Sequence, residues 1–436
     1  MSHVFGRGSG LPRVARARGC EVWDSEGRRY LDAAGGAVVV GIGHGDAAVV
    51  AAIRAQAAEV AYAHGTMFTS EALEAYAEEL AGVVPVDDAR VYPVSGGSEA
   101  VETALKMARA YHLARGEDRH RVLARWGSYH GNTRGALDAS GREPLRRPYL
   151  PWLGHTEHTL APYEYRCPFT GTHPRGCGAR YAEALEHAIL DSGPRTVAAF
   201  VAEPIAGAAL GATVPPDDYW PAVVETCRRH GVLVIADEVM TGFGRTGRWF
   251  GCDHWDVRPD ILVAAKGAAS GYWPLGLAVA SGRVHDTIAA RGFTHGFTFS
   301  HHVVGAAAGR AVLRVLRERN LVAAAEAQGK RLRAGLEERL GGHRAVGDVR
   351  GLGLMLAAEL VADRATRAPF PRVERVTERV VAAARRRGLL VYSSTGCADG
   401  RDGDLIMLGP PLVISDAEVD ETVALLGDAL EEVVPP

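Results

Sequence analysis

The sequence predicts an α/β fold built on a buried, mainly parallel sheet with helices on both faces. Continuous apolar runs of strand length recur through the middle of the chain, and helical stretches lie between several of them. Such runs are typical of strands that crossover helices cover on both faces. The expected strands are Val91–Val94, Arg121–Ala124, Val197–Ala202, Val232–Ala236, Ile261–Ala265 and Leu277–Ser281. The expected helices between them are Ser98–Arg115, Ala179–Ser192 and Asp217–His230.

The two ends of the chain have a different pattern, which predicts a smaller α+β domain. The last third begins with a long amphipathic helix, followed by short strands and helices over Val346–Leu360, Pro371–Arg387, Leu389–Tyr392, Leu405–Leu408 and Ser415–Val433. The N-terminal segment has short strands at 21–24 and 28–32 and helices over 47–60 and 70–81, with Ser70 as the N-cap of the second helix. We therefore expect a small domain made of 1–62 and 319–436, and a large domain over 63–318.

The composition is that of an ordinary globular protein and excludes several classes of function. The 436 residues are 47% hydrophobic and 23% charged, with a net charge of −3. This balance gives no electrostatic basis for binding nucleic acid or an anionic membrane. We also expect no membrane span and no signal peptide, because no apolar run approaches about 20 residues. Six scattered cysteines do not form a disulfide framework, so we expect a reducing cytoplasm.

Lysine is nearly absent, which makes the few that remain informative. Only three of the 49 basic residues are lysines, namely Lys106, Lys266 and Lys330. A lysine amine can deprotonate and attack a carbonyl, whereas arginine cannot. We expect Lys106 to pair with Glu102 on a helix and Lys330 to lie on a solvated helix face. Lys266 ends an expected strand, where open α/β sheets bind ligands, and is the candidate for an activated amine.

Two further segments would complete a cofactor site around Lys266. Asp237 follows the preceding expected strand, and a carboxylate opposite a pyridine nitrogen keeps that nitrogen protonated. The Ser95–Ala100 loop opens a helix, so its glycine amides and the Ser98 hydroxyl could hold an anion. Taken singly, Asp237 could equally be a loop cap and Ser95–Ala100 an ordinary glycine turn. Together with Lys266 they indicate a small phosphorylated cofactor.

Two other patterns resemble ligand-binding motifs but do not indicate a binding site. The string Gly242–Gly247 matches G-x-G-x-x-G, but no helical pattern follows it, so we expect no dinucleotide site. Histidines are numerous, yet the chain has neither C-x-x-C nor H-E-x-x-H. We expect no metal, and Cys167 with Cys177 is the only pair that merits a test.

Six strings carry a family resemblance that spans nearly the whole chain. They are, in order, SGGSEAVETALKMAR, WGSYHGNTRGAL, VAEPIAG, ADEVMTGFGRTG, ILVAAKGAASGYWPLG and HGFTFSHH. Together they resemble the class III aminotransferases of pyridoxal-phosphate fold type I, from about Val22 to Leu412. The resemblance implies a large domain with a mainly parallel seven-stranded sheet and a smaller α+β domain drawn from both termini. It also implies a homodimer with active sites at the subunit interface.

By position, the resemblance implies a pyridoxal 5′-phosphate site and assigns its residues. Lys266 would hold the cofactor as a Schiff base and move the substrate Cα proton, and Asp237 would pair with the pyridinium nitrogen. The other implied contacts are ring packing by Val239 and Tyr129, phosphate binding by Gly97 and Ser98, a phosphate contact from the partner subunit by Thr298, and a contact near the ring by Glu203. Without the family context, Tyr129 and Val239 would be interpreted as core residues.

The chain departs from the family pattern near the implied site. Met240 stands where relatives often have glutamine, and His301–Val303 replaces the usual Gly-His-Pro. Arg401 precedes Pro410-Pro411-Leu412 and is a candidate for binding a substrate carboxylate, although an exposed loop position is the alternative. Family position also makes Trp23, Met67 and Phe68 candidates for the pocket of the amine donor.

The resemblance implies ping-pong transfer of an amino group from an amine or ω-amino acid to a 2-oxo acid or aldehyde. Two alternatives, a 1,2-aminomutase and an amino-acid decarboxylase, would reuse the same cofactor residues, so the motifs do not exclude them. A binding protein without a cofactor is a third alternative, and it predicts a colourless protein.

Overall fold

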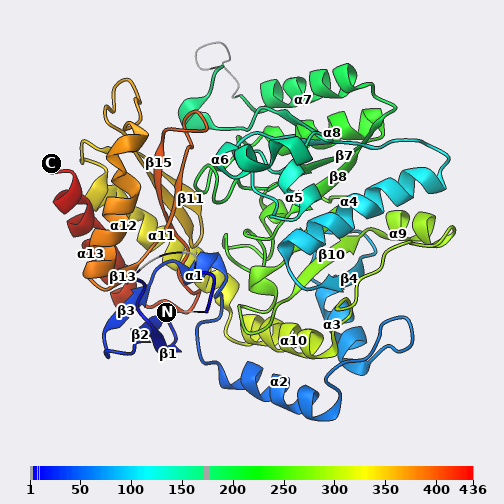
Figure 1. Ribbon diagram of the computed structural model, residues 1–436, viewed down its shortest axis with the longest axis horizontal. Helices are drawn as coiled ribbons and strands as arrows, with labels where there is room; N and C mark the ends of the chain where they lie inside the picture. The colour runs from blue at the N-terminus through cyan, green and yellow to red at the C-terminus, as the bar shows by residue number, and fades with distance from the viewer. Residues whose placement is uncertain (1–2, 7, 9, 170–176, 436) are drawn as a thin grey trace.

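The computed structural model describes residues 3–6, 8, 10–169 and 177–435, and shows three sheets surrounded by helices (Figure 1). The largest sheet has seven strands in the order β4-β10-β9-β8-β7-β5-β6. Their bounds are β4 (Arg90–Val94), β5 (Arg121–Arg125), β6 (Thr156–Thr159), β7 (Val197–Ala202), β8 (Leu233–Asp237), β9 (Ile261–Ala264) and β10 (Gly276–Ala280). From β9 to β6 all neighbours are parallel, and only β10 runs antiparallel to both of its neighbours. The expected mainly parallel seven-stranded sheet is confirmed.

The apolar runs of the central strands follow from helices on both faces of this sheet. Alternate residues Ala199 and Val201 pack towards α4 (Gly97–Ala114), in one buried cluster. Their neighbours Phe200 and Ala202 pack in a second cluster with α7 (Gly178–Ser192) and α8 (Tyr219–His230). Because side chains alternate along a strand, burial on both faces requires every position to be apolar.

Both ends of the chain build the two small sheets. The first sheet contains β1 (Val14–Arg18), β2 (Glu21–Asp24), β3 (Arg29–Asp32) and β13 (Leu389–Leu390), and β13 pairs in parallel with β3. The second is antiparallel, with β11 (Val346–Leu352), β12 (Met355–Leu360), β15 (Asp404–Leu408) and β14 (Tyr392–Thr395) in that order. The helices of this part are α11 (Leu321–Leu340), α12 (Val376–Arg386) and α13 (Asp416–Val433). The expected joining of the two termini is confirmed by the β3–β13 pair.

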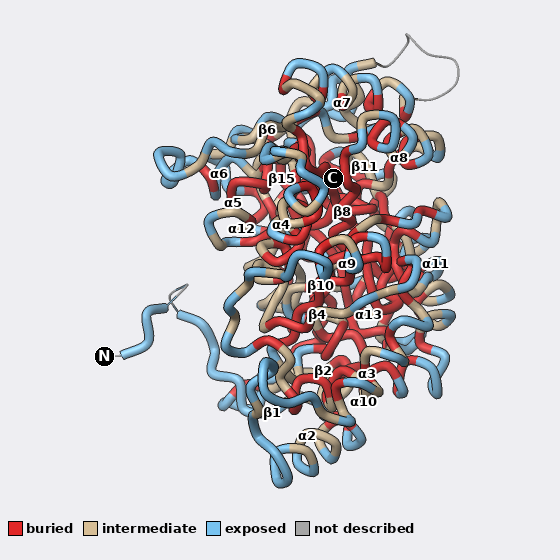
Figure 2. Tube along the Cα trace, turned by 90° about the vertical axis from the view of Figure 1, so that its right-hand side faces the viewer, coloured by how far each residue is buried: buried red, intermediate tan, exposed pale blue. Residues whose placement is uncertain are grey.

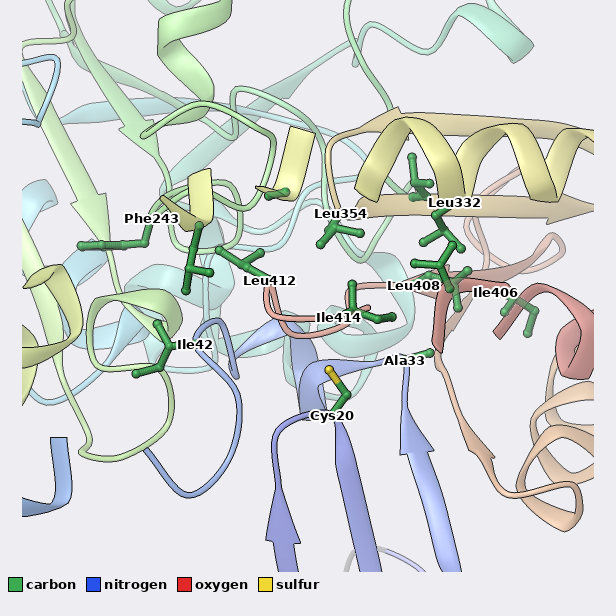
Figure 3. Close-up of a cluster of buried hydrophobic side chains, with 14 of the residues drawn as sticks. Cys20, Ala33, Ile42, Phe243, Leu332, Leu354, Ile406, Leu408, Leu412 and Ile414 are labelled. Carbon is green, nitrogen blue, oxygen red and sulfur yellow. The ribbon is translucent and has the colours of Figure 1, made fainter. Parts of the chain in front are cut away.

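One continuous core connects the small sheets with the large one. Buried residues run through the middle of the molecule, and the exposed residues lie at its periphery (Figure 2). Figure 3 shows part of this core, where Cys20 and Ala33 of the N-terminal segment lie near Leu408 and Ile414 of the C-terminal part. Phe243 contributes from the Gly242–Gly247 loop, which consists of turns and opens no helix.

Two helices near the N-terminus pack against a helix that follows the large sheet in sequence. Both α2 (Ala47–Glu59) and α3 (Glu71–Ala81) pack on α10 (Val303–Glu318) (Figure 1). The Ser70 hydroxyl accepts the Leu73 amide, as its predicted N-cap role requires. The domain boundaries at 62/63 and 318/319 stay a prediction, and α2, which falls in the predicted small domain, packs on α10 of the predicted large domain.

The sequence did not indicate several elements, and one expected ion pair does not form. The helices α1 (Gly35–Val38), α5 (Arg134–Ala139), α6 (Glu143–Arg146), α9 (Gly282–Ala289) and α10, and the edge strand β6, were not predicted. The expected Lys106–Glu102 pair is wrong: the Glu102 carboxylate accepts the Gly135 amide at 2.7 Å, and Lys106 approaches His295 instead. Lys330 does lie on an exposed helix face, paired with Glu326.

Candidate active site

A cavity of about 370 Å³ opens at the carboxyl ends of β8 and β9. This is the edge of an open α/β sheet at which ligands are expected to bind. Residues from six separate parts of the chain line it, and they include Ser95, Gly96, Gly97, Ser98, Tyr129, His130, Gly131, Glu203, Asp237, Val239, Met240, Lys266 and Trp273. Seven of the residues singled out from the sequence are therefore brought to one cavity.

Lys266 occupies the turn directly after β9. Its backbone has a φ of 43°, in the left-handed region that non-glycine residues rarely adopt. Burial lowers the pKa of Lys266 to about 8, against the opposing influence of the Asp237 and Glu203 carboxylates. A substantial fraction of the amine is consequently neutral near physiological pH, as nucleophilic attack requires.

Asp237 ends β8, the strand beside β9, and its carboxylate is fixed by two contacts. Oδ1 accepts the Val239 amide at 3.0 Å, and Oδ2 lies 2.7 Å from Nδ1 of His130. The strand ends are also joined directly, since the Glu238 amide donates to the Val263 carbonyl at 2.8 Å. This ladder holds Asp237 and Lys266 at adjoining positions on one sheet edge.

The N-terminus of α4 forms another wall of the cavity. Glycines bring the surrounding backbone close: a Cβ on Gly276 would lie 2.2 Å from the Gly96 carbonyl, and one on Gly131 would lie 2.6 Å from the Ser98 hydroxyl. Ser98 also exchanges hydrogen bonds with Asn132. Backbone amides at the positive end of an 18-residue helix suit an anion, and a phosphate fits this wall.

Glu203, Tyr129 and Met240 shape the rest of the cavity. The Glu203 carboxylate accepts the Gly207 amide at 2.9 Å and the Tyr129 amide at 3.4 Å, and burial raises the pKa of Glu203. Met240 packs so closely over Gly207 that a Cβ there would lie 2.6 Å from the Met240 sulfur. At this position the Met240 thioether can provide only a weak hydrogen-bond acceptor to the cavity.

Five of the candidate residues, including Met67, which is 75% exposed, lie outside this cavity. Thr298 sits in an exposed loop, where its carbonyl accepts the Tyr62 hydroxyl at 2.8 Å. Trp23 lies in β2, and the guanidinium carbon of Arg16 stacks 3.7 Å from the centre of the Trp23 ring. Phe68 is 68% exposed, and the Arg401 side chain is 77% exposed on a turn capped by Asp399. In a single chain none of these five candidates lines the pocket.

His130 and Trp273 are among the cavity residues that were not identified from the sequence. His130 was part of a quoted string, but nothing in the spacing indicated that its ring would reach Asp237, 107 residues away. Its Nε2 is buried and has no hydrogen-bond partner among the described residues. Trp273 lines the cavity from the segment between Lys266 and β10, and only its position after a short glycine-rich turn could have indicated this.

The described part of the chain has neither a cluster of metal-ligating side chains nor a membrane-spanning helix. Among those residues, no group of three or more histidine, cysteine, aspartate or glutamate side chains is placed to hold a metal ion. None of the described helices combines the length and apolar character needed to cross a membrane.

A partly buried amine and a buried carboxylate at neighbouring strand ends, beside an anion-binding helix N-terminus, define an enzyme that uses a phosphorylated carbonyl cofactor with a basic ring nitrogen. Pyridoxal phosphate fits each of these groups: an aldehyde for the amine, a pyridine nitrogen for the carboxylate and a phosphate for the helix. The glycines that line the cavity keep space that a Cβ would fill.

Comparisons with known proteins agree with this site. Residues 6–430 match the family described as aminotransferase class-III. The chain is 39% identical to the uncharacterized aminotransferase YodT of Bacillus subtilis, with 98% of this chain and 96% of that protein covered. It is 35% identical to a putrescine–pyruvate aminotransferase of Pseudomonas aeruginosa, covering 96% and 90%. A solved (S)-enantioselective ω-transaminase from Thermomicrobium roseum superimposes with a TM-score of 0.93 at 38% identity, covering 99% and 97%.

The chain belongs to the class III aminotransferase family. It is an aminotransferase, and enzymes of this family depend on pyridoxal phosphate. A solved amine transaminase from an uncultivated Pseudomonas species, described in its PLP-bound form, superimposes with a TM-score of 0.92 at 38% identity, covering 99% of this chain and 98% of that one. The family, fold and cofactor expected from the sequence are confirmed.

Proposed function

We propose that this aminotransferase works through Lys266, with Asp237 as the partner of the cofactor's ring nitrogen. The observation that carries this proposal is the pairing of β8 with β9, which brings the only lysine and one of the two carboxylates of the cavity to adjoining strand ends. Glu203, the other carboxylate, is held by the backbone amides of Gly207 and Tyr129, which suits a supporting contact near the ring.

The remaining cofactor contacts are assigned from the lining of the cavity. The Gly97 and Ser98 amides and the Ser98 hydroxyl would bind the phosphate at the start of α4. Tyr129 and Val239 would pack on the ring. When bound, pyridoxal phosphate supplies an electrophilic carbonyl and a ring that accepts electrons. Asp237, kept buried and hydrogen-bonded, would hold a proton on the ring nitrogen.

Lys266 is the group that moves protons in this proposal. Its Nζ would first hold the cofactor and, once an amine substrate has displaced it, would take a proton from the substrate carbon. Burial keeps the pKa of this amine near 8, so Nζ can both accept and return a proton at neutral pH. The donor and the acceptor would bind to the same cavity in turn, which gives ping-pong kinetics.

The cavity suits a primary amine or ω-amino acid as donor and a 2-oxo acid or aldehyde as acceptor. Its lining includes the apolar side chains of Val39, Met240, Trp273 and Leu275, and no arginine of the described chain is among the lining residues. An apolar lining favours an amine without a carboxylate on the reacting carbon. The names of two relatives, a putrescine–pyruvate aminotransferase and an ω-transaminase, support the same class of substrates.

We further propose a homodimer in which Thr298 reaches the partner's cavity. Thr298 is exposed and lies outside the cavity of its own chain, beside the apolar rings of Tyr62 and Phe299. Exposed apolar side chains gathered in one place are typical of subunit interfaces. We place the enzyme in the cytoplasm, because its six scattered cysteines form no disulfide framework of the kind that secreted proteins carry.

Mixed dimers test both the interface and Lys266. A Lys266→Ala subunit and a Thr298→Asp subunit should each be nearly inactive alone. Co-expressed, they should regain up to about half of the activity per mixed dimer, because one of the two sites combines intact Lys266 with the partner's intact Thr298. Recovery that does not exceed the sum of the two variants would contradict a shared site.

The substrate class is tested by mixing the holoenzyme with a panel of amine donors and recording loss of the cofactor's absorbance before any acceptor is added. Diamines and ω-amino acids should bleach it within one half-reaction, and pyruvate or 2-oxoglutarate should restore it. Full turnover with a single substrate and no acceptor would contradict the proposal and indicate an aminomutase or a decarboxylase.

A further inference from the structure

Two cysteines far from the active site lie within contact of each other. The Sγ atoms of Cys167 and Cys177 are 2.9 Å apart, and the two residues are ten positions apart in sequence. The two sulfurs are not joined in a disulfide in this structure. The sulfur–sulfur distance in a disulfide is about 2.05 Å, so the two Sγ atoms lie within about 1 Å of bonding distance.

The backbone on either side of the pair is well anchored. Cys177 is the N-cap residue of α7, and the Cys167 amide donates to the Glu164 carbonyl at 3.1 Å. Both cysteines pack at the edge of the cluster that joins α7 and α8 to the large sheet. Nearby, the rings of Phe169 and Tyr181 meet edge-to-face at 5.2 Å. A bond between the sulfurs would therefore link two fixed points.

The segment just before Cys167 connects the small antiparallel sheet to the part of the molecule that carries the large sheet. The Tyr163 hydroxyl and the Arg166 guanidinium both donate to the carboxylate of Glu359, a fully buried residue of β12. Arg166 also donates to the Arg367 carbonyl at 2.9 Å. We call residues 163–166 the clamp segment, because they fasten the small antiparallel sheet to the helix layer of the large one. Cys167 follows this segment directly.

We propose that Cys167 and Cys177 are a redox-active pair that forms a reversible disulfide and ties the clamp segment to α7. The oxidant is a small disulfide such as oxidised glutathione. A thiolate of one cysteine attacks it and releases one glutathione thiol, and the second cysteine then displaces the other. Two cysteine thiols thereby lose two electrons and two protons, and one molecule of oxidised glutathione becomes two of the reduced form.

The local chemistry sets the rate of this step. The hydrogen bond with Cys167, together with burial, raises the pKa of the Cys177 thiol to about 11. Because the thiolate is the attacking species, oxidation should be slow at neutral pH and accelerate as the pH rises towards that value. A pair of this kind would respond to sustained oxidation and ignore brief exposure.

Thiol counting and mass spectrometry test the proposal on the holoenzyme, independently of its activity. After incubation with oxidised glutathione, the native mass should show loss of two hydrogens without added glutathione, and digestion should give one peptide linking Cys167 to Cys177. The oxidised protein should melt about 2–5 °C higher, and dithiothreitol should reverse the shift.

Variants locate the effect. Cys167→Ser and Cys177→Ser should each abolish the cross-linked peptide and the melting shift, and instead carry one glutathione on the remaining cysteine. Cys20→Ala, which removes a buried cysteine of another cluster, should leave both unchanged. Six free thiols after prolonged oxidation, stable glutathione adducts on both cysteines of the wild type, or thiols protected by a bound metal would each overturn the proposal.

Discussion

The carboxylate of Asp237 and the imidazole of His130 are joined by a 2.7 Å contact between Oδ2 and Nδ1. Both side chains are buried, and they come from different elements: Asp237 ends β8, and His130 follows β5. Since Oδ1 accepts the Val239 amide, each carboxylate oxygen has its own donor. His130 therefore fixes the orientation of the carboxylate that we propose to face the cofactor's ring nitrogen.

Removal of this imidazole should lower activity through Asp237. In His130→Ala, Oδ2 loses its partner while the carboxylate remains, so we expect kcat to fall about 10–100-fold, the effect of one hydrogen bond to a charged group. Asp237→Asn removes the charge itself and should cost more. Steady-state kinetics and the cofactor's absorbance against pH measure both. An unchanged pH dependence of the absorbance in His130→Ala would show that the ring does not act through Asp237.

The reactivity of Lys266 should depend on pH in a defined direction. Burial lowers the pKa of its amine from the ordinary 10.5 to about 8, so the neutral, reactive fraction grows until the pH passes that value. The rate at which apoenzyme takes up pyridoxal phosphate should rise about tenfold per pH unit below the pKa and level off above it. Stopped-flow absorbance measures this rate. A rise that continues to about pH 10 would indicate an ordinary exposed lysine.

Gly131 should be essential for the phosphate-binding wall. Its φ of 141° is unfavourable for other residues, and a Cβ there would lie 2.6 Å from the Ser98 hydroxyl. Gly131→Ala should therefore weaken binding of pyridoxal phosphate at least about tenfold, measured by fluorescence titration of apoenzyme. Gly342→Ala is the matched control, since no atom lies within 4 Å of its Cβ position. Equal affinity in both variants would refute the tight packing at this wall.

The buried carboxylate of Glu359 should stabilise the joint between the small antiparallel sheet and the clamp segment. It contacts Tyr163, Arg166 and Arg350, and Glu359→Gln would leave the Arg166 guanidinium without a charged partner among the described residues and Arg350 with Asp348 alone. We expect the free energy of unfolding to fall by about 3–5 kcal/mol, measured by denaturant titration. Glu326→Gln removes a carboxylate from an exposed pair and should change it by less than about 1 kcal/mol. A similar loss in both would contradict this role.

The large sheet could be predicted because its pattern is local. Each central strand is a continuous apolar run, and the expected span Val197–Ala202 is the span of β7. The strand β6 was missed because Thr156–Thr159 is polar and half-buried at the sheet edge. The helix α10 was missed because the string HGFTFSHH ends at His302, and no motif indicated the helix that begins at the next residue.

Site residues could be predicted where their role follows from residue type and position after a strand. They could not be predicted where their role depends on contacts between residues far apart in the sequence. Lys266 and Asp237 were identified because each ends an apolar run, and strand order places them side by side. The Lys106–Glu102 pair failed because the amides of a separate helix, α5, reach Glu102 first. His130 could not be recognised because its contact with Asp237 exists only in the folded chain.

Mapping the covalent cofactor adduct decides whether Lys266 performs the reaction. Borohydride reduction of the holoenzyme followed by peptide mass spectrometry should place pyridoxyl phosphate on Lys266 alone, and Lys266→Ala should lose the adduct together with at least about 10³-fold in turnover. Lys106→Arg and Lys330→Arg should keep both. An adduct on Lys106 or Lys330, or wild-type turnover in Lys266→Ala, would contradict the assignment.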